Sequence, residues 1–179
     1  MSRRSALVAL VAAVAVVLLI VLFATAPTDP DRQGADPLDD RPAPAINATD
    51  TAGRPFHIDD YRGHWLVVNF FATWCTPCKI EHPELVAFSR AHSTKGDAAV
   101  VSIAYDDEAP AIADFFKKNG GDWPVISKNT AGISLAYGVV KLPESFLVDT
   151  CGTVVHKFVG GVTAAGIDAE IAKRGGGSK

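Results

Sequence analysis

The feature of this sequence that most restricts its fold is the apolar run HWLVVNFFA at residues 64–72. The run has the length of a strand and does not alternate with polar residues, which is typical of a strand buried on both faces of a sheet. A helix is expected directly after it, from about Cys75 to His92. We therefore expect a central strand that leads straight into a helix, inside a sheet that is covered on both sides.

Strands and helices continue to alternate beyond this unit. The expected elements are strands at 97–105 and 123–127, helices at 108–120 and 130–138, two strands within 145–161 and a last helix at 162–174. Pro110 in the first turn of one helix and Gly120 after its end are typical helix boundaries. A short hairpin is expected upstream, where INATD and RPFHI flank the TAG at 51–53. The pattern predicts an α/β fold, with a mixed central sheet flanked by helices on both faces and an N-terminal β-hairpin.

A long uncharged segment precedes this domain. It runs from Ser5 to Ala26 and holds about twenty apolar residues, enough for a helix to cross a bilayer. Arg3 and Arg4 stand before it, so the positive-inside rule keeps residues 1–4 in the cytoplasm and sends the rest outside. We expect residues 5–26 to form an N-terminal transmembrane helix that acts as a signal-anchor. Cleavage at the small residues of its end is the alternative, and both options export the same domain.

The remaining boundaries follow from composition. Residues 27–43 are rich in Pro and Asp and nearly free of large apolar side chains, so they predict a flexible linker. Residues 44–174 hold the expected globular domain, and residues 175–179 are a loose tail. The formal net charge of −3 provides no basic stripe for nucleic acid and no polybasic patch for anionic lipid, so neither partner is expected.

The three cysteines are too few to staple a domain of this size. Cys75 and Cys78 are separated by two residues, and a bridge between them closes too small a loop to add much stability. A zinc site needs four ligands, and only His82 could join the pair on one helical face, so no metal is expected. Such a histidine is more often a solvated surface residue. Cys151, in the turn between the last two strands, is expected to be an unpaired, non-catalytic thiol.

The position of the cysteine pair favours electron transfer. Cys75 is expected at the start of the helix, where free backbone N–H groups and the helix dipole stabilise a thiolate, the form that attacks disulfides. Cys78 lies one turn deeper and can attack the resulting mixed disulfide. Pro77 fits the first helical turn and restrains the loop between the sulfur atoms. The redox-active disulfide is then the reactive group, so no separate cofactor is expected.

The stretch NFFATWCTPCKIEHPEL at residues 69–85 resembles the active-site signature of the thioredoxin superfamily. It is most similar to the membrane-tethered, extracytoplasmic thiol–disulfide oxidoreductases that include the ResA, TlpA and DsbE/CcmG proteins. Further matches are TAGRPFHIDDYRGHWLVVNF at 51–70, LAYGVVKLPESFLVDTCGTV at 135–154 and FVGGV at 158–162. The resemblance covers residues 44–173 and implies a thioredoxin-like fold.

The resemblance also implies roles for residues at matching positions. Pro143 resembles the cis-proline that faces the cysteine pair, and Leu142 before it would offer backbone atoms to a bound peptide. Trp74 is similar to the aromatic residue that flanks the nucleophile. Thr76 and Pro77, between the cysteines, would help to set the stability of the thiolate.

Two acidic residues and one amide complete the implied site. Glu81 matches the acid of the family pattern and would move a proton to or from Cys78, with a solvated helix residue as the alternative. Glu144 resembles the glutamate that follows the cis-proline in the DsbE/CcmG group, so it is expected at the substrate-binding surface and favours a role in cytochrome c maturation. Asn69 stands where thioredoxin carries a buried aspartate, and the tethered branch often shares this asparagine.

The resulting hypothesis is a thiol–disulfide oxidoreductase on the extracytoplasmic side of the cell membrane. Cys75 attacks, Cys78 resolves, and a membrane redox partner resets the pair. The expected substrates are disulfides or dithiols of exported proteins, with the cysteines of apocytochrome c as a candidate. The direction stays open because reductases and oxidases share this scaffold, and a copper- or zinc-handling chaperone using the same cysteines is the alternative class. A thiol peroxidase is disfavoured, because Ala72 rather than a threonine lies three residues before Cys75.

Overall fold

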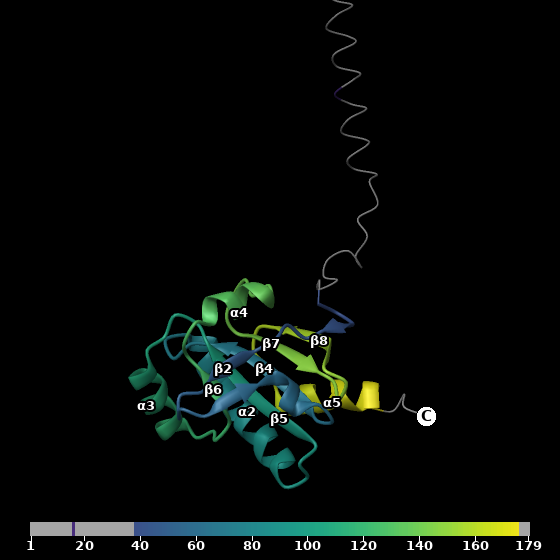
Figure 1. The fold of residues 1–179 in the computed structure, drawn as a ribbon, viewed down its shortest axis with the longest axis horizontal. Coiled ribbons are helices and arrows are strands. Elements are labelled where there is room, and N and C mark those ends of the chain that lie inside the picture. Colours follow the sequence, from purple (N-terminus) through teal and green to yellow (C-terminus); the bar gives the residue numbers. More distant parts are fainter. Residues whose placement is uncertain (1–15, 17–37, 176–179) are drawn as a thin grey trace, which may run out of the picture. The chain divides into compact units, whose positions relative to one another are not determined.

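The computed structural model describes Val16 and residues 38–175 (Figure 1). The expected transmembrane helix at 5–26, apart from Val16, lies outside the described residues, as do residues 27–37 of the expected linker and 176–179 of the tail. In the described part of the chain, no helix is long and apolar enough to cross a membrane.

Residues 38–175 form an α/β domain around a mixed sheet that has six strands in this described range (Figure 1). The strands are β1 (Arg41–Pro42), β4 (Trp65–Phe71), β5 (Ala98–Ala104), β6 (Val125–Ile126), β7 (Glu144–Val148) and β8 (Thr153–Val159). They lie in the order β1-β8-β7-β4-β5-β6. β4, β5 and β6 are parallel, β7 runs antiparallel to β4, and β8 runs antiparallel to both β7 and β1. β4 is thus interior to the sheet, as its uninterrupted apolar sequence predicts.

The expected N-terminal hairpin is present. It consists of β2 (Asn47–Thr49) and β3 (Pro55–His57), which are antiparallel, and it leads into the short 3-10 helix η2 (Ile58–Tyr61). The hairpin side chains of Ile46 and Phe56 are buried in the same core cluster as Phe70 of β4. The hairpin therefore covers part of the central sheet.

The start of the domain differs from the expectation. Arg41 and Pro42 were expected in the flexible linker, but they form β1 and pair with residues of β8. The Asp40 N–H donates to the Val154 carbonyl, and Leu38 packs against the core. The Pro- and Asp-rich composition did not predict this strand, because an edge strand is held by backbone hydrogen bonds and tolerates proline. Residues 38–43 therefore belong to the folded domain.

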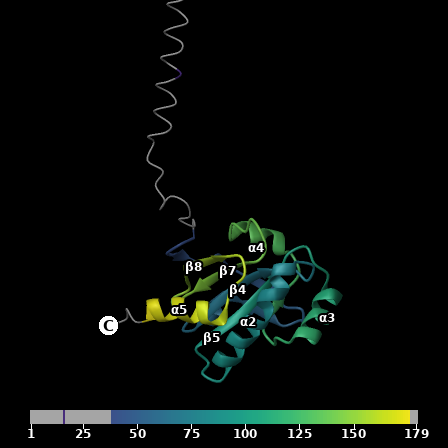
Figure 2. The ribbon, with the colours of Figure 1, turned by 180° about the vertical axis from the view of Figure 1, so that it is seen from behind.

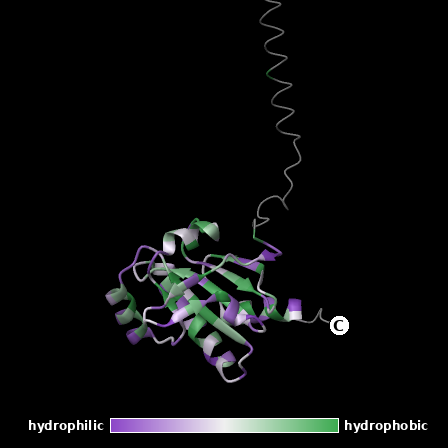
Figure 3. Ribbon diagram, in the orientation of Figure 1, coloured by the Kyte–Doolittle hydropathy of each residue, from purple (hydrophilic) through white to green (hydrophobic). Residues whose placement is uncertain are grey.

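Helices cover both faces of the sheet, as predicted. α2 (Thr76–Ser93), α3 (Ala109–Asn119) and α5 (Ala164–Gly175) pack on one face, and α4 (Thr130–Ala136) packs on the other. We call these the α2 face and the α4 face. α5 lies beside α2 (Figure 2). Apolar residues concentrate on the strands between the two layers (Figure 3), so the core lies on both sides of β4.

The topology brings three distant segments to one edge of the sheet. The parallel strands β4 and β5 both end at this edge, so α2 and Tyr105 follow there. Glu144 of the antiparallel β7 pairs with Phe70 near the end of β4, so Pro143 reaches the same edge. The cysteine pair, the residue after β5 and the residues before β7 therefore meet.

Candidate active site

The loop from β4 to α2 places the cysteine pair. β4 ends at Phe71 and α2 begins at Thr76, so Cys75 occupies the N-cap position of the helix. The Sγ of Cys75 accepts the N–H of Cys78 at 3.3 Å, and a disulfide joins the two cysteines. Pro77 lies in the first turn, where its missing N–H costs no helical hydrogen bond. Cys75 thus sits at the free N–H groups of a helix, as expected.

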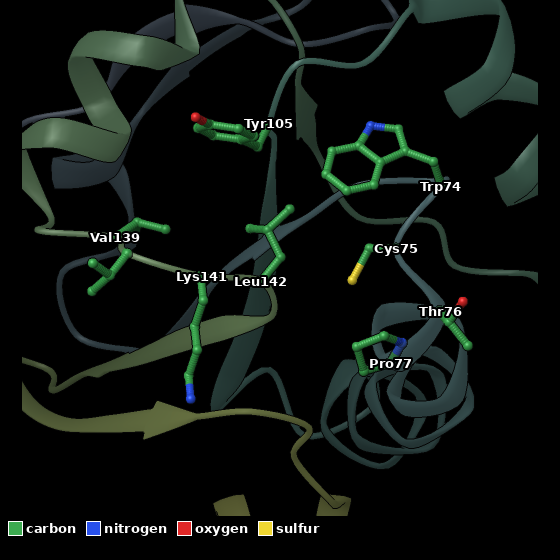
Figure 4. A pocket seen from close by; sticks show the side chains of 9 residues that line it. Trp74, Cys75, Thr76, Pro77, Tyr105, Val139, Lys141 and Leu142 are labelled. Atoms are coloured by element: carbon green, nitrogen blue, oxygen red, sulfur yellow. The ribbon is translucent and has the colours of Figure 1, made fainter.

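The two cysteines differ in their access to the surface. Both are buried, but Cys75 lines a pocket of about 460 Å³ and Cys78 does not. The walls come from residues 74–77 at the start of α2, Tyr105 after β5 and residues 139–142 before β7. Figure 4 shows the Cys75 sulfur pointing into this space, between Pro77 and Leu142. A sulfur atom that enters the pocket therefore meets Cys75 first.

Two contacts tie the loop before the cysteines to the loop after β5. The carboxylate of Asp107 accepts the backbone N–H of Thr73 at 2.5 Å and its hydroxyl at 3.0 Å. The indole N–H of Trp74 donates to the carbonyl of Asp106 at 3.1 Å, although 58% of the Trp74 surface is exposed. Trp74 is therefore a fixed apolar wall, across the pocket from Val139 (Figure 4).

The segment before β7 forms the other wall. The Leu142–Pro143 peptide bond is cis, as the resemblance implies. Leu142 lines the pocket together with Val139, Val140 and Lys141. Of these, Val140 is 86% exposed, which adds an apolar surface beside the opening. A bound polypeptide would thus find apolar contacts on both sides of Cys75.

Glu81 lies in α2, one turn after Cys78, and only 3% of its surface is exposed. One carboxylate oxygen accepts a side-chain N–H of Asn69 at 2.8 Å, and the other accepts the backbone N–H of Val162 at 3.1 Å. Burial raises the pKa of Glu81 to about 7, and the two hydrogen bonds oppose that increase. The solvated alternative is therefore wrong: Glu81 is a buried acid that can change its protonation near neutral pH.

His82 is buried as well, at 3% exposure, so the expectation of a solvated histidine is wrong. Its ring packs against Phe115 and Trp123, and its Nε2 donates to the carbonyl oxygen of Gly120 at 2.8 Å. Burial lowers the pKa of His82, which favours the neutral ring. His82 thus connects α2 to α3 and the loop after it. Among residues 38–175, no three His, Cys, Asp or Glu side chains are grouped to hold a metal ion.

Glu144 differs from the expectation of a substrate-binding residue. Its side chain is 1% exposed and does not line the pocket. One carboxylate oxygen lies 3.2 Å from the Nζ of Lys157 and also accepts the N–H of Val140 at 3.4 Å. Glu144 therefore acts on the pocket by holding the 139–142 segment from beneath, a position that the sequence motif could not reveal.

Sequence reasoning missed several residues of the site. Tyr105, Val139, Val140 and Lys141 line the pocket, and Asp107 fixes the loop before the cysteines. One signal was present for Tyr105: it is the last residue of the strand expected at 97–105, and neighbouring parallel strands end at the same edge of a sheet. Cys151 is a free, exposed cysteine outside the pocket, as expected.

The disulfide at a helix N-terminus, the cis peptide bond beside it and the mixed sheet define a thiol–disulfide oxidoreductase with a thioredoxin-like fold. Residues 38–172 match the family described as Redoxin, and the chain belongs to this family. It is 30% identical over 131 residues to the thiol-disulfide oxidoreductase ResA of Bacillus thuringiensis subsp. konkukian, covering 73% of this chain and 75% of that protein. The Bacillus subtilis ResA is 31% identical over 121 residues, covering 68% of this chain and 67% of that protein.

A solved structure supports the same assignment. The chain is similar to a thiol:disulfide interchange protein of the thioredoxin family from Chlorobium tepidum TLS, with a TM-score of 0.68 and 28% sequence identity. The match covers 74% of this chain and 94% of that one. The resemblance to the ResA oxidoreductases is thus confirmed by sequence, and the thioredoxin-like fold is confirmed by the solved structure.

Proposed function

We propose that this protein is tethered to the cell membrane by residues 5–26 and reduces disulfides of exported proteins, with the haem-binding cysteines of apocytochrome c as the substrate class. The observation that carries the proposal is the asymmetry of the disulfide: Cys75 opens onto the pocket and Cys78 is enclosed. The ResA relatives and the cis-proline segment beside Cys75 support it. The uncharged N-terminal segment after Arg3 and Arg4 supports the location.

In the forward direction the reduced protein begins with Cys75 as a thiolate. Cys75 attacks one sulfur of the substrate disulfide, a new S–S bond forms, and the departing substrate sulfur takes up a proton. Cys78 then attacks the Sγ of Cys75, which forms the Cys75–Cys78 bond and releases the second substrate sulfur as a thiol. The substrate gains two electrons and two protons. The cysteine pair supplies both electrons and the proton of Cys78, and the second proton comes from solvent, which had received the Cys75 proton on ionisation.

Glu81 is suited to the second step. Cys78 is enclosed, so its proton needs an acceptor inside the protein, and the carboxylate of Glu81 lies one helical turn away. Its pKa of about 7 lets the same group accept that proton and later release it at neutral pH. In the reverse reaction Glu81 returns the proton to the leaving sulfur of Cys78.

The pocket walls are suited to a polypeptide substrate. Trp74 and Val140 offer exposed apolar surface, and Leu142 presents backbone beside the sulfur of Cys75. Thr76 and Pro77 form the wall between the cysteines. A cysteine in an extended, partly apolar segment fits this surface, and a membrane redox partner would use the same opening to reset the pair.

Trapping tests the proposal. Full-length Cys78→Ser should accumulate mixed disulfides between Cys75 and its exported substrates, because the second step cannot occur. The matched control, Cys75→Ser, should trap none. If Cys78→Ser is folded and membrane-bound but forms no mixed disulfides in cells, the proposed function is wrong.

The reduction potential of the pair separates reduction from oxidation. A value near the about −270 mV of thioredoxin supports a reductase, whereas a value near the about −120 mV of DsbA supports the oxidase alternative. The trapped partners provide the second readout. The lone Cys75 thiol of Cys78→Ser exchanges directly with a substrate disulfide, as expected for a reductase, whereas a dithiol substrate of an oxidase could be trapped only after a separate oxidant had acted on Cys75.

A further inference from the structure

A row of polar side chains crosses the centre of the sheet beneath α2. Asn69 of β4 lies directly between Ser145 of β7 and Ser102 of β5 in the strand register. Each of the three is at most 1% exposed. Polar groups at such depth are costly unless they are hydrogen-bonded, so their arrangement here requires a reason.

Hydrogen bonds order this row in one direction. The indole N–H of Trp123, which can only donate, bonds to the Ser102 hydroxyl oxygen at 2.9 Å. The Ser102 hydroxyl in turn donates to the side-chain oxygen of Asn69 at 3.2 Å. This leaves the Asn69 amide NH₂ to donate to Glu81 at 2.8 Å and to Ser145 at 3.1 Å. The sequence of donors therefore ends on the carboxylate of Glu81.

If the Asn69 amide were turned so that its oxygen and nitrogen exchanged places, it would no longer donate to the carboxylate of Glu81. Its carbonyl would then face the carboxylate of Glu81, a contact that is favourable only when Glu81 is protonated. The Ser102 hydroxyl would lose its acceptor while Trp123 still occupied its oxygen. The buried row therefore favours the orientation that supports an ionised Glu81.

We infer that Trp123, Ser102 and Asn69 form a donor chain that positions the carboxylate of Glu81 and stabilises its ionised, proton-accepting form. These are positioning residues, since they act through Glu81 and do not line the pocket. The inference rests on the proposed function for the catalytic use of Glu81, but the chain itself is a property of the folded oxidised protein. Its predicted effect opposes burial, which is the largest influence on the pKa of Glu81.

Among the described residues, the groups from neighbouring elements that hydrogen-bond to Glu81 are neutral. β4 contributes the Asn69 amide, and the segment before α5 contributes the Val162 N–H. On α2 itself, four titratable side chains lie within three residues of Glu81. They are Cys78, which is in the disulfide, the exposed Lys79, His82, whose ring donates to the Gly120 carbonyl, and Glu84, whose carboxylate accepts the N–H of Ala164. The donor chain is therefore the feature of the sheet that acts on this carboxylate.

The test measures the pKa of Glu81 directly in the oxidised, full-length protein. Carbon-13 NMR of labelled glutamate carboxyl groups follows the titration, and Glu81→Gln assigns the signal. Ser102→Ala removes one link of the chain and should raise the pKa of Glu81 by about 0.3 pH units, because only the cooperative part of the bond is lost. Asn69→Ala removes the direct donor and should raise it by about 1 pH unit or more.

The structure offers a matched control for the Ser102 variant. Ser134 of α4 has a buried hydroxyl for which the described residues provide no hydrogen-bond partner. Ser134→Ala removes the same atom from the α4 face and should leave the pKa of Glu81 unchanged. Trp123→Phe keeps a six-membered aromatic ring but removes the five-membered ring with its N–H, the first donor. It should raise the pKa of Glu81 and provides the second variant if Ser102→Ala does not fold.

A pKa of Glu81 that is the same in Ser102→Ala, Trp123→Phe and Ser134→Ala would overturn the inference. The rate of mixed-disulfide resolution against pH gives the second readout, and its rise should move to higher pH by the same amount as the pKa. If the pKa moves but the rate profile does not, the donor chain stands and the proposed catalytic role of Glu81 fails. If substrate exchange depends on Glu81 but the pKa of Glu81 is unchanged in the donor-chain variants, the proposed function stands and this inference fails.

Discussion

Glu81 and Glu144 are buried on opposite faces of the central sheet, and the partners of their carboxylates differ. On the α2 face, Glu81 is met by the neutral N–H groups of Asn69 and Val162. On the α4 face, Glu144 is met by the ammonium of Lys157 at 3.2 Å. Both are glutamates with at most 3% exposure, so burial alone does not distinguish them.

The residues around the two glutamates differ as well. Phe70, Tyr137 and Phe146 pack against one another on the α4 face with centroids 5.1 to 5.7 Å apart, and the Nζ of Lys157 lies 5.0 Å from the Phe146 ring. The α2 face instead contains a hydrogen-bonded polar row. A buried carboxylate with a cationic partner is a fixed structural charge, whereas one with neutral donors can gain and lose a proton. The protein therefore places the carboxylate whose pKa is raised by burial on the face of the cysteines, and the carboxylate with an ionic partner beneath the pocket wall.

Removal of the cation on the α4 face should have the largest effect. Lys157→Met keeps the apolar stem but leaves Glu144 buried without its ionic partner, and we expect a loss of about 4 kcal/mol in the free energy of unfolding. Urea denaturation at pH 7 measures this loss. The double variant Glu144→Gln/Lys157→Met should recover most of it. A loss below about 1 kcal/mol in the single variant would show that the two carboxylates are equally tolerant of neutral surroundings.

The pH dependence of stability should separate the faces next. The pKa of Glu81 in the folded protein, about 7, lies above its ordinary value of 4.5, so the folded state retains a proton that the unfolded state has lost between these pH values. Stability from this group is present below pH 4.5 and is lost as the pH rises to about 7. The loss should be about 3 kcal/mol, because the difference of 2.5 pH units corresponds to about 1.4 kcal/mol per unit, and Glu81→Gln should remove it.

Urea denaturation of the oxidised protein from pH 4 to 8 is the measurement. Wild type and Glu144→Gln should both show the decline, since that second variant leaves Glu81 intact. Parallel curves for wild type and Glu81→Gln would show that the Glu81 carboxylate does not titrate in this range. The neutral partners of Glu81 would then not set it apart from Glu144.

The smallest effect comes from two buried hydroxyls, one on each face. Ser145→Ala removes the acceptor of an Asn69 N–H in the polar row and should cost about 1 kcal/mol. Ser134→Ala removes a hydroxyl that has no partner among the described residues, so its effect should lie within about 0.5 kcal/mol of zero. Thermal and urea unfolding of the two variants give the difference. Equal losses would mean that the polar row contributes no net hydrogen-bond stability.

Much of the fold could be predicted because its signals are local. The apolar runs became β4 and β5, and Pro110 and Gly120 bound α3 as expected. The hairpin around TAG and the turn before β8 were also found at the expected places. The strand formed by Arg41 and Pro42 was missed, because its hydrogen bonds come from a strand more than a hundred residues later and leave no mark on local composition.

The residues of the active site could likewise be predicted only in part. Cys75, Cys78 and Pro77 could be placed from the sequence alone, since a helix N-terminus depends on neighbouring residues. Glu81 and His82 could not be assigned to the interior, because consecutive helix positions reveal nothing of what covers them. Their partners, Val162 and Gly120, are backbone groups that only the folded chain brings within hydrogen-bond distance.

The sequence by itself thus determined that a buried strand delivers two cysteines to the start of a helix, and with it the class of chemistry. The tertiary structure decided which partner each buried glutamate meets, because the chain segments that bring a neutral amide or an ammonium opposite it are distant in the sequence. Glu81 and Glu144 are the same residue type, and only the packing of α2 and β8 onto the sheet gives them different partners.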